Sequence, residues 1–387
     1  MSARNEIATA ARTRLSLSDS RTRRSALLVF GFTCAVGLGA AFAATNEARI
    51  YDPRPAGPDF AFGADLSFLK QAEDRGKVFK DGTNAMPGLK LFREHGYNWI
   101  RLRIFVEPVG GSLPNNLAYT LAMAKDAKQL GYDLLLDFHY SQTWADPGKQ
   151  PTPEAWRALS HPERVRKVFE YTRDTIAAFR DAGVLPGMVQ VGNEITHGML
   201  WPDGRLPEQW DNFAEYVCAG INGVDAGRGN GRRPRIMLHL DQGASIPRTK
   251  YFFDRINSYD LPYDVIGFSY YPWWHGTITE LRANLAFAEN EYGKDVMVVE
   301  AAFHWRPNRE TAGRAQPFPE TPEGQREFLE EVTRAVMDTP NGRGKGVFWW
   351  EPAVTGGLGS RGFFDDDGAA LPVIKAFDKY TRPKRRE

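Results

Sequence analysis

Residues 133–140 read Asp-Leu-Leu-Leu-Asp-Phe-His-Tyr, an apolar run that ends in polar and aromatic side chains. The same arrangement recurs at residues 295–300, Asp-Val-Met-Val-Val-Glu, where four apolar residues lead to a glutamate. Continuous apolar runs of this length are typical of parallel strands that are buried on both faces of a sheet. Both segments therefore predict interior strands whose carboxyl ends carry functional side chains.

Eight such runs alternate with helix-like stretches along the chain. The strand candidates are residues 60–64, 98–105, 133–140, 188–193, 235–240, 265–270, 295–300 and 346–350, and the helix candidates include 118–130, 162–182, 278–292 and 322–337. Eight β-then-α units in about 340 residues predict a single α/β domain, a (β/α)8 TIM barrel with enlarged βα loops. A doubly wound open sheet is the alternative, but it does not explain what collects at the strand ends.

The N-terminal segment has the organisation of a secretory signal peptide. Arg21, Arg23 and Arg24 precede an uncharged run over residues 26–40, and Ala41-Phe42-Ala43 is an A-x-A cleavage site. We therefore expect residues 1–44 to be a signal peptide and residues 45–387 to be the mature barrel domain, secreted or periplasmic and free of the membrane. A retained anchor helix is the alternative, because the run is at the short end of the membrane-spanning range.

Composition limits the partners of the mature chain. The whole chain has 49 Lys and Arg and 48 Asp and Glu; without residues 1–44, 43 basic residues face 46 acidic ones. This balance disfavours nucleic-acid binding. Two cysteines cannot form a disulfide framework. The aromatic share of 12%, with 10 Trp, exceeds what packing alone requires and indicates a surface that stacks on sugar rings.

Polar and aromatic residues gather at the carboxyl ends of the predicted strands, where TIM barrels place their chemistry. The residues at or near these ends include Asp65, Arg101, Arg103, His139, Asn193, Glu194, Asp241, Tyr271, Trp273, Trp274, Glu300 and Trp350. Arg101 and Arg103 are two residues apart and so share one face of their strand, which we expect to meet carboxylates in the barrel interior.

Glu194 and Glu300 are each the first charged residue after an apolar run, on the fourth and seventh predicted strands. Glycoside hydrolysis with retention needs two carboxyl groups about 5–5.5 Å apart, one a nucleophile and the other a proton donor. Asn193 could donate to a sugar 2-hydroxyl, and Arg101 would keep Glu300 ionised. One glutamate at a strand end is more often a salt-bridged structural residue, but this pair, with a Trp on the eighth strand, favours catalysis.

Six segments together resemble glycoside hydrolase family 53, the secreted endo-β-1,4-galactanases that cut the galactan side chains of pectin. They are residues 139–148 (His-Tyr-Ser-Gln-Thr-Trp-Ala-Asp-Pro-Gly), 191–195 (Val-Gly-Asn-Glu-Ile), 201–205 (Trp-Pro-Asp-Gly-Arg), 267–272 (Gly-Phe-Ser-Tyr-Tyr-Pro), 298–300 (Val-Val-Glu) and 348–352 (Phe-Trp-Trp-Glu-Pro). The likeness runs from residue 62 to residue 377, and the motifs follow the family's order. Asn-Glu is common to a whole clan of retaining barrels, whereas the segment at 139–148 is more specific to the family.

The resemblance implies a role for each matching residue. Glu194 matches the acid/base and Glu300 the nucleophile; Arg101, Asn193, Tyr271 and Trp350 match the subsite at the cleaved bond; His139, Trp144 and Asp146 match the loop of the neighbouring subsite; Asp65 and Asp241 match the floor of the cleft. Gln142 departs from the family, which usually has Asp there, so the preference of that subsite is in doubt.

Several features leave alternatives open. Trp273 and Trp274, with His275, could form a stacking platform or cap the barrel mouth. Residues 365–368, Asp-Asp-Asp-Gly, could bind calcium, although they read first as a tight turn. The dispersed histidines disfavour a catalytic metal, and we expect no organic cofactor. The sequence thus predicts a monomeric galactanase with a polysaccharide substrate. The alternatives are a retaining barrel that acts on another β-glycan, such as mannan or glucan, and a catalytically silent carbohydrate-binding barrel.

Overall fold

Eight parallel strands close into a barrel in the order β1-β12-β11-β10-β9-β6-β5-β4. The computed structural model describes residues 59–110, 112–354 and 356–381. The barrel strands are β1 (Ala61–Asp65), β4 (Trp99–Ile104), β5 (Asp133–Phe138), β6 (Met188–Val191), β9 (Arg235–Leu240), β10 (Val265–Tyr270), β11 (Asp295–Ala301) and β12 (Gly344–Trp349). The (β/α)8 prediction is confirmed, and every predicted strand end lies within two residues of the observed one.

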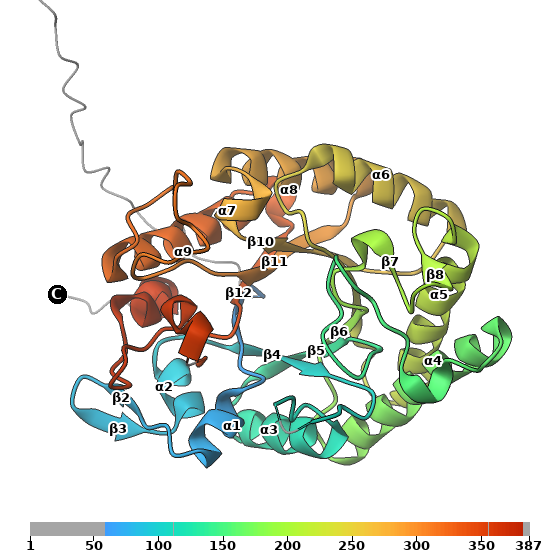
Figure 1. Ribbon diagram of the computed structural model, residues 1–387, viewed down its shortest axis with the longest axis horizontal. Coiled ribbons are helices and arrows are strands. Elements are labelled where there is room, and N and C mark those ends of the chain that lie inside the picture. The colour runs from blue at the N-terminus through green and yellow to red at the C-terminus, as the bar shows by residue number, and fades with distance from the viewer. Residues whose placement is uncertain (1–58, 111, 355, 382–387) are drawn as a thin grey trace, which may run out of the picture. The chain divides into compact units, whose positions relative to one another are not determined.

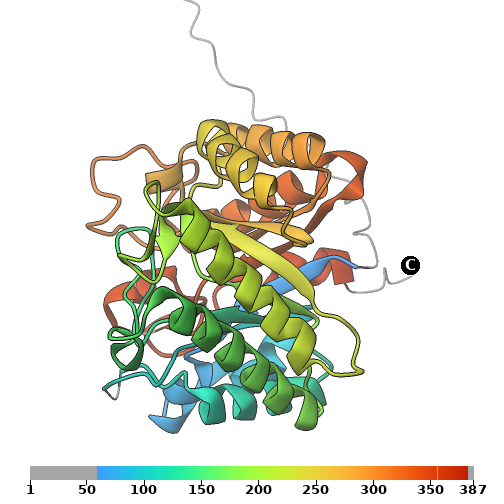
Figure 2. The same ribbon diagram turned by 90° about the vertical axis from the view of Figure 1, so that its right-hand side faces the viewer.

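Helices surround the strands as an outer ring (Figure 1). They are α1 (Leu69–Asp74), α2 (Gly88–Glu94), α3 (Leu117–Gln129), α4 (His161–Asp181), α5 (Trp210–Gly227), α6 (Ile246–Ile256), α7 (Pro272–His275), α8 (Ile278–Tyr292), α9 (Pro322–Met337) and α10 (Asp378–Thr381). Helices α4 and α5 lie side by side on the outside of the barrel (Figure 2). Helix α8 begins with a capping box of Thr277 and Glu280 and ends at Gly293, whose φ of 60° is the left-handed cap expected of glycine.

Short elements fill the connections between strands and helices. Two antiparallel pairs, β2 (Phe79–Asp81) with β3 (Asn84–Met86) and β7 (Gly198–Met199) with β8 (Gly204–Arg205), lie outside the barrel. The 3-10 helices are η1 (Glu154–Trp156), η2 (Ile195–His197), η3 (Asn257–Tyr259), η4 (Pro340–Gly342), η5 (Gly356–Arg361) and η6 (Pro372–Phe377). Of these, η2 comes shortly after β6 and has Glu194 at its N-terminal cap, whereas η5 comes after a longer loop that follows β12 and ends at Arg361.

Beneath the carboxyl ends of the strands, the barrel interior is packed with apolar side chains. Its members are Ala61, Leu135, Met188, Met237, Val265, Met297, Val299 and Phe348, all essentially buried. Phe348 fills the space beside Gly63, where an added Cβ would lie 2.2 Å from the ring. Above this layer the inward positions change to polar residues, so that Leu135 is followed on the same face of β5 by Asp137. The apolar layer thus forms a rigid floor for a polar site.

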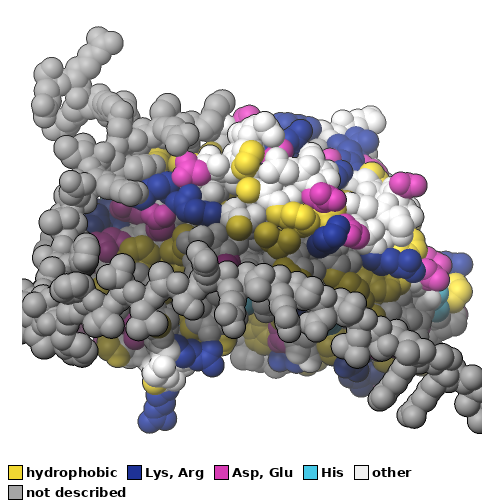
Figure 3. All heavy atoms as spheres, turned by 90° about the horizontal axis from the view of Figure 1, so that it is seen from above, with side chains coloured by type: hydrophobic (Ala, Val, Ile, Leu, Met, Phe, Trp, Pro, Cys, Tyr) yellow, Lys and Arg dark blue, Asp and Glu magenta, His cyan; other side chains and the backbone are white. Residues whose placement is uncertain are grey.

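The expected signal peptide, residues 1–44, lies outside the described residues. Among the residues that the structure does describe, no helix is both long and apolar enough to cross a membrane. On the face drawn in Figure 3, Lys and Arg side chains alternate with Asp and Glu side chains over the described residues. This mixed charge agrees with the near balance of the composition.

Candidate active site

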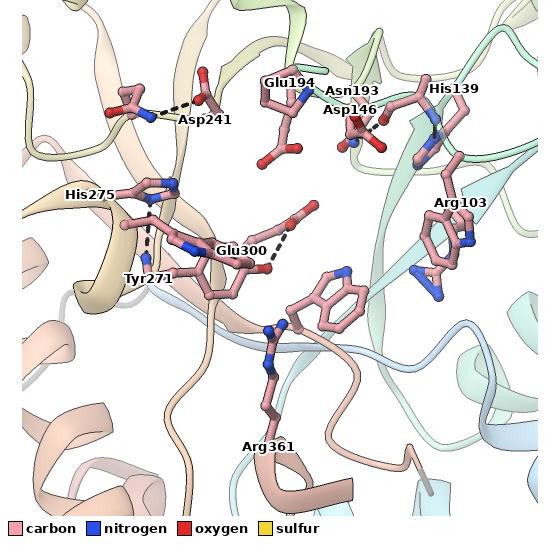
Figure 4. Close-up of a pocket in the computed structure, with 16 residues that line it drawn as sticks. Arg103, His139, Asp146, Asn193, Glu194, Asp241, Tyr271, His275, Glu300 and Arg361 are labelled. Atoms are coloured by element: carbon pink, nitrogen blue, oxygen red, sulfur yellow. Dashed lines mark hydrogen bonds between the residues drawn. The ribbon is translucent and has the colours of Figure 1, made fainter. Parts of the chain in front are cut away.

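A cavity of about 520 Å³ opens at the carboxyl ends of the barrel strands. Its lining combines carboxylates, basic groups and aromatic rings from most of the βα loops (Figure 4). The lining residues are Arg103, His139, Trp144, Ala145, Asp146, Pro147, Asn193, Glu194, Asp241, Gln242, Tyr271, Trp274, His275, Glu300, Trp350 and Arg361. Glu194 and Glu300, the pair singled out in the sequence, both point into this cavity (Figure 4).

Glu300 reaches the cavity because of an irregularity in β11. Val298 pairs with Phe268 of β10, yet Glu300 pairs with Ser269, so Val299 is an extra residue in β11. A bulge of this kind re-aims the side chain that follows it. Val299 belongs to the apolar floor, and the bulge lets Glu300 point inward as well. Strict alternation would have turned this carboxylate away from the site.

The carboxylate of Glu300 is held from two sides. Oε1 lies 2.8 Å from Nη1 of Arg101, and Oε2 accepts a hydrogen bond of 2.9 Å from the hydroxyl of Tyr271. Both partners stabilise the ionised form. Burial raises the pKa of Glu300, and Arg101 and Tyr271 oppose that increase. The expected contact with Arg101 is therefore present, but burial competes with it.

Glu194 lies directly after β6, where the chain turns into η2. Its backbone is left-handed, with φ 46° and ψ 54°, a conformation that non-glycine residues adopt mainly at constrained sites. The side chain of Gln150 donates to the carbonyl oxygens of Asn193 and Glu194 and so holds this turn. Oε1 of Glu194 accepts a hydrogen bond of 2.7 Å from Ser269.

The two carboxyl groups have different electrostatic surroundings. Burial, with the negative charges of Glu300 and Asp241, raises the pKa of Glu194 well above that of a free carboxyl group. The hydrogen bond from Ser269 and the more distant charge of Arg101 offset this only in part. Because Arg101 directly contacts Glu300, the pair differs in the direction that a proton donor and a nucleophile need.

Arg101 is the centre of a buried polar network beneath the cavity. Its guanidinium contacts Asp65 at 2.8 Å, Asp137 at 2.9 Å and Oδ1 of Asn193 at 2.8 Å, in addition to Glu300. These negative charges raise its pKa against the effect of burial. The prediction that Arg101 meets interior carboxylates is confirmed, and Asp65, which is fully buried, lies below the cavity rather than in its lining.

Arg103 has a separate set of partners at the edge of the cavity. It forms ion pairs with Asp65, at 3.5 Å, and with the buried Glu351. Its guanidinium also lies 4.7 Å from the ring centroid of Trp144 and 4.6 Å from that of Phe68. Such cation–π contacts favour the observed position of an aromatic ring. Arg103 therefore supports Trp144 at the wall of the cavity.

Asn193 and His139 are oriented by hydrogen bonds on their hidden sides. Oδ1 of Asn193 accepts from Arg101, and its Nδ2 donates one hydrogen to the carbonyl of Ala145 at 2.9 Å. Because an amide nitrogen carries two hydrogens, one remains for the cavity side. Nδ1 of His139 accepts from the backbone N–H of Ala145, so its Nε2 is the donor toward Asp137 at 3.1 Å.

Comparison with known proteins places this arrangement in one family, because the model of glycosyl hydrolase family 53 matches residues 61–377. The chain belongs to glycosyl hydrolase family 53. Over 313 residues it is 34% identical to arabinogalactan endo-beta-1,4-galactanase A of Emericella nidulans, covering 77% of this chain and 87% of that protein. An uncharacterized protein of Niallia circulans is 39% identical over 314 residues, with coverages of 76% and 84%. The Ignisphaera aggregans GH53 catalytic domain superposes with a TM-score of 0.78 at 31% identity, covering 86% of this chain and 99% of that one.

This family 53 member is thus a glycoside hydrolase, and most of its sequence-predicted site residues lie around one cavity. Ten of them contribute to the lining directly: His139, Trp144, Asp146, Asn193, Glu194, Asp241, Tyr271, Trp274, Glu300 and Trp350. Asp65 and Arg101 lie beneath it and act on it through Glu300 and Asn193.

Trp273 and Trp274 have different environments in the structure of the family 53 enzyme. Trp274 is 50% exposed and lines the cavity, whereas Trp273 is 4% exposed and its ring packs 4.9 Å from that of His304. The shared platform expected from the sequence therefore reduces to Trp274, because the neighbouring ring is buried beneath it. Successive residues of a helical turn point about 100° apart, and α7 is one such turn.

The lining also includes residues to which the sequence assigned no definite site role, among them Gln242, His275 and Arg361. Gln242 donates to Asp241 at 2.9 Å, and Nδ1 of His275 lies 3.1 Å from the backbone N–H of Tyr271. Arg361 comes from η5 and lies between 5.1 and 5.8 Å from the centroids of four rings, those of Tyr271, Trp273, Trp274 and Trp350. His275 was named in the sequence only as a possible part of the platform with Trp273 and Trp274. Gln242 follows β9 closely and could have been found by the strand-end criterion, but Arg361 is too far from β12.

The acidic run at residues 365–368 forms a turn. Oδ1 of Asp365 accepts hydrogen bonds from the backbone of Asp367 and Ala369, and Asp366 is paired with Arg306 at 2.8 Å. Within the described residues, no group of three or more His, Cys, Asp or Glu side chains could hold a metal ion. The turn therefore explains this motif without a cation.

Proposed function

We propose that this protein is a secreted, retaining endo-β-1,4-galactanase that acts on the galactan or arabinogalactan side chains of pectin. The observation that carries the proposal is the pair Glu194 and Glu300 in one cavity, with only Glu300 in direct contact with an arginine. Membership of family 53 and the name of the Emericella nidulans relative, an arabinogalactan endo-beta-1,4-galactanase, support the choice of substrate.

In the first step Glu300 attacks the anomeric carbon while protonated Glu194 gives its proton to the leaving glycosidic oxygen. The glycosidic bond breaks and a covalent glycosyl-enzyme forms. In the second step ionised Glu194 takes a proton from water, which attacks the same carbon and releases Glu300. The raised pKa of Glu194 keeps it available as the acid, and Arg101 and Tyr271 favour the charge on Glu300.

The aromatic lining offers the apolar faces that sugar rings need. Trp144, Trp274 and Trp350 line the cavity from three different loops, and Trp144 and Trp350 approach each other at 6.2 Å. In this proposal the second N–H of Asn193, which the contact with Ala145 does not use, donates to a sugar 2-hydroxyl, a contact that strengthens in the transition state. Asp146 and Asp241 supply acceptors for other hydroxyls at the two flanks of the cavity.

The proposal of secretion rests on the signal-like residues 1–44 alone, and N-terminal sequencing of protein from the culture medium or periplasm tests it. A mature chain that begins near residue 44 or 45 is expected. An N-terminus at residue 1 in a membrane fraction would favour the anchor helix instead. Size-exclusion chromatography of the same material tests the proposed monomer.

Product analysis on a panel of polysaccharides tests the activity. Linear β-1,4-galactan should yield internal cleavage products, with the β-anomer formed first by NMR, while mannan and glucan stay intact. Activity on mannan but none on galactan would reject the substrate, and initial release of the α-anomer would reject retention. Glu194→Gln and Glu300→Gln should each lose at least about a hundredfold in kcat on galactan.

A matched control separates loss of chemistry from loss of a buried carboxyl group. Glu289 of α8 is 3% exposed, bonds to Asn341 and does not line the cavity. Glu289→Gln should therefore keep galactan hydrolysis within about twofold of the parent, because a buried glutamate outside the site contributes to folding only. Equal losses in this control and in the two site variants would remove the case for catalytic roles.

A further inference from the structure

A chain of hydrogen bonds runs from Arg101 to Glu194 beneath the cavity floor. Arg101 approaches Oε1 of Gln190 with Nε at 3.3 Å and Nη2 at 3.2 Å. Arginine can only donate, so the amide oxygen of Gln190 must face it and the amide nitrogen must face away. That nitrogen donates to Asp137 at 2.7 Å and lies 3.0 Å from Nδ1 of His239. The orientation of Gln190 is thereby fixed.

His239 has its tautomer fixed by the same reasoning. The backbone N–H of Glu194 points at Nδ1 from 3.3 Å, and a backbone N–H can only donate. Oδ1 of Asn193 also lies 3.2 Å from Nδ1, but that oxygen already accepts from Arg101. Two donors, Nε2 of Gln190 and the N–H of Glu194, thus face Nδ1, which is therefore an acceptor, and the ring proton is on Nε2. His239 is fully buried, which lowers its pKa well below the usual value and keeps the ring neutral. In a charged ring Nδ1 would also carry a hydrogen, which would face the backbone N–H of Glu194.

Ser269 links His239 to Glu194 by two hydrogen bonds. Nε2 of His239 lies 2.9 Å from Oγ of Ser269, and that oxygen lies 2.7 Å from Oε1 of Glu194. Because Nε2 donates to the serine oxygen, the serine hydroxyl uses its single hydrogen toward Oε1. That oxygen of Glu194 is therefore held as an acceptor in both protonation states.

We propose that His239 and Ser269 are positioning residues that confine the catalytic proton of Glu194 to Oε2, the carboxyl oxygen turned toward the glycosidic bond. No described residue forms a hydrogen bond with Oε2, and the carboxyl group points into the cavity (Figure 4). The proton is thus presented in one place rather than shared between two oxygens. The inference rests on the acid/base role proposed above for Glu194.

The chain also joins the two carboxyl groups of the site. Arg101 contacts Glu300 through Nη1 and Gln190 through Nε and Nη2, so one guanidinium begins both branches. Arg101 therefore donates directly to Oε1 of Glu300. Its second branch reaches Oε1 of Glu194 through Gln190, His239 and Ser269. The charged groups that act on Glu194 are Glu300 of β11, Asp241 after β9 and Arg101 of β4. Ser269 is an uncharged residue that contacts Glu194, and a single substitution removes its hydrogen bond.

The test compares Ser269→Ala with Ser269→Thr, which keeps the hydroxyl, by pH profiles of kcat/KM. Two substrates are used, galactan and a 2,4-dinitrophenyl β-galactobioside, whose leaving group needs no proton. For Ser269→Ala we expect kcat/KM on galactan to fall roughly tenfold, and that on the dinitrophenyl substrate less than about threefold. Loss of a donor to the carboxylate disfavours its charged form, so the alkaline limb should move up by about half a pH unit or more.

Ser269→Thr should keep the alkaline limb of the parent enzyme. An unmoved limb in Ser269→Ala, with equal losses on both substrates, would show that Ser269 has only a structural role and would overturn the inference. The inference would also be overturned if the alkaline limb of Ser269→Thr moved as far as that of Ser269→Ala. Glu194→Gln keeps the two proposals apart: if it still cleaves galactan, the acid/base role itself fails, whereas an inactive Glu194→Gln beside an unmoved limb rejects the positioning role alone.

Discussion

Tyr271 donates its phenolic hydroxyl to Oε2 of Glu300 at 2.9 Å, while Arg101 contacts Oε1 of the same carboxylate. Tyr271 stands at the end of β10 and starts α7, so the strand that also carries Ser269 serves both carboxyl groups. One strand thus aligns the nucleophile and the acid. The buried hydroxyl of Tyr271 has a raised pKa and remains a donor throughout the working pH range.

Tyr271→Phe removes the donor on Oε2 of Glu300 and leaves the ring in place. A hydrogen bond to a carboxylate stabilises its charged form, so its loss raises the pKa of Glu300. We expect kcat/KM on galactan to fall roughly 10- to 100-fold and the acid limb of its pH profile to move up, since the nucleophile must be ionised. The measurement is kcat/KM between pH 3 and pH 9.

The neighbouring residue supplies the control for this tyrosine substitution. Tyr270 is fully buried, and its hydroxyl donates to the carbonyl of Gly276 at 3.0 Å, away from the cavity. Tyr270→Phe should lower the free energy of unfolding by about 1 kcal/mol and leave the acid limb where it is. A shift of the limb in both variants would mean that the effect comes from packing in β10 and not from the bond to Glu300.

Glu194→Gln is expected to stabilise the fold at neutral and alkaline pH. The pKa of Glu194 is raised in the folded protein, so the native state binds this proton more tightly than the unfolded chain does. Stability is therefore lost as the pH rises from about 4.5 through the folded pKa, where the buried group must ionise. Glutamine does not ionise and avoids this loss. Each kcal/mol that is regained should raise Tm by about 2–4 °C.

Calorimetry of the parent and of Glu194→Gln at pH 4 and pH 8 checks this expectation. The difference in Tm between the two proteins should be small at pH 4 and should favour the variant at pH 8. A difference that is the same at both pH values would indicate that the variant changes packing alone. Such stabilisation by removal of an active-site group is the usual trade between function and stability.

The barrel could be predicted because its strands are apolar on both faces. Leu134, Leu135 and Leu136 give β5 its near-continuous apolar run, as do Val296 to Val299 in β11. Eight such runs alternate with helix-like stretches, and this count is enough to select the closed barrel. Glu194 and Glu300 could be found because they form a pair of glutamates at strand ends, together with Trp350 on the eighth strand; one such glutamate alone would have indicated a structural ion pair.

Other parts of the site depend on geometry that the sequence does not encode locally. Ser269 acts on Glu194 across 75 positions of the chain, and only the bulge at Val299 brings Glu300 level with it. Arg361 comes from η5, which has neither an apolar period nor a strand end to mark it. The polar chain through Gln190 needs the register of β4, β5, β6 and β9, which is a property of the closed barrel.

Trp274 and Trp273 should respond oppositely to truncation. Trp274→Ala removes a half-exposed ring from the cavity edge, so KM for long galactan should rise several-fold while Tm changes little. Trp273→Ala removes a buried ring and should lower the free energy of unfolding by about 3–5 kcal/mol. Galactan kinetics together with chemical denaturation of both variants make the comparison. A large loss of stability in Trp274→Ala with unchanged KM would reject its place in substrate binding.

Gln142, the residue that departs from the family pattern, joins two loops outside the cavity lining. Its Oε1 accepts from the backbone N–H of Glu154 at 2.8 Å, and its Nε2 donates to the carbonyl of Glu107 at 3.3 Å. Gln142→Asp keeps an acceptor on a shorter side chain but loses the donor. We expect a loss of stability of about 1 kcal/mol or less and an unchanged product pattern on galactan, measured by denaturation and chromatography of the oligosaccharides.

Gln142→Glu is the matched control, because it introduces the same carboxylate as the aspartate variant and loses the same donor, but keeps the length of the side chain. If the contact with Glu107 matters, the aspartate and glutamate variants should lose similar stability, and both should release the same oligosaccharides as the parent enzyme. A changed product pattern in Gln142→Asp would mean that this position acts on the substrate through the loop at residues 139–148. Gln142 would then influence substrate specificity. Its contacts with two backbone groups indicate instead that it holds two loops together.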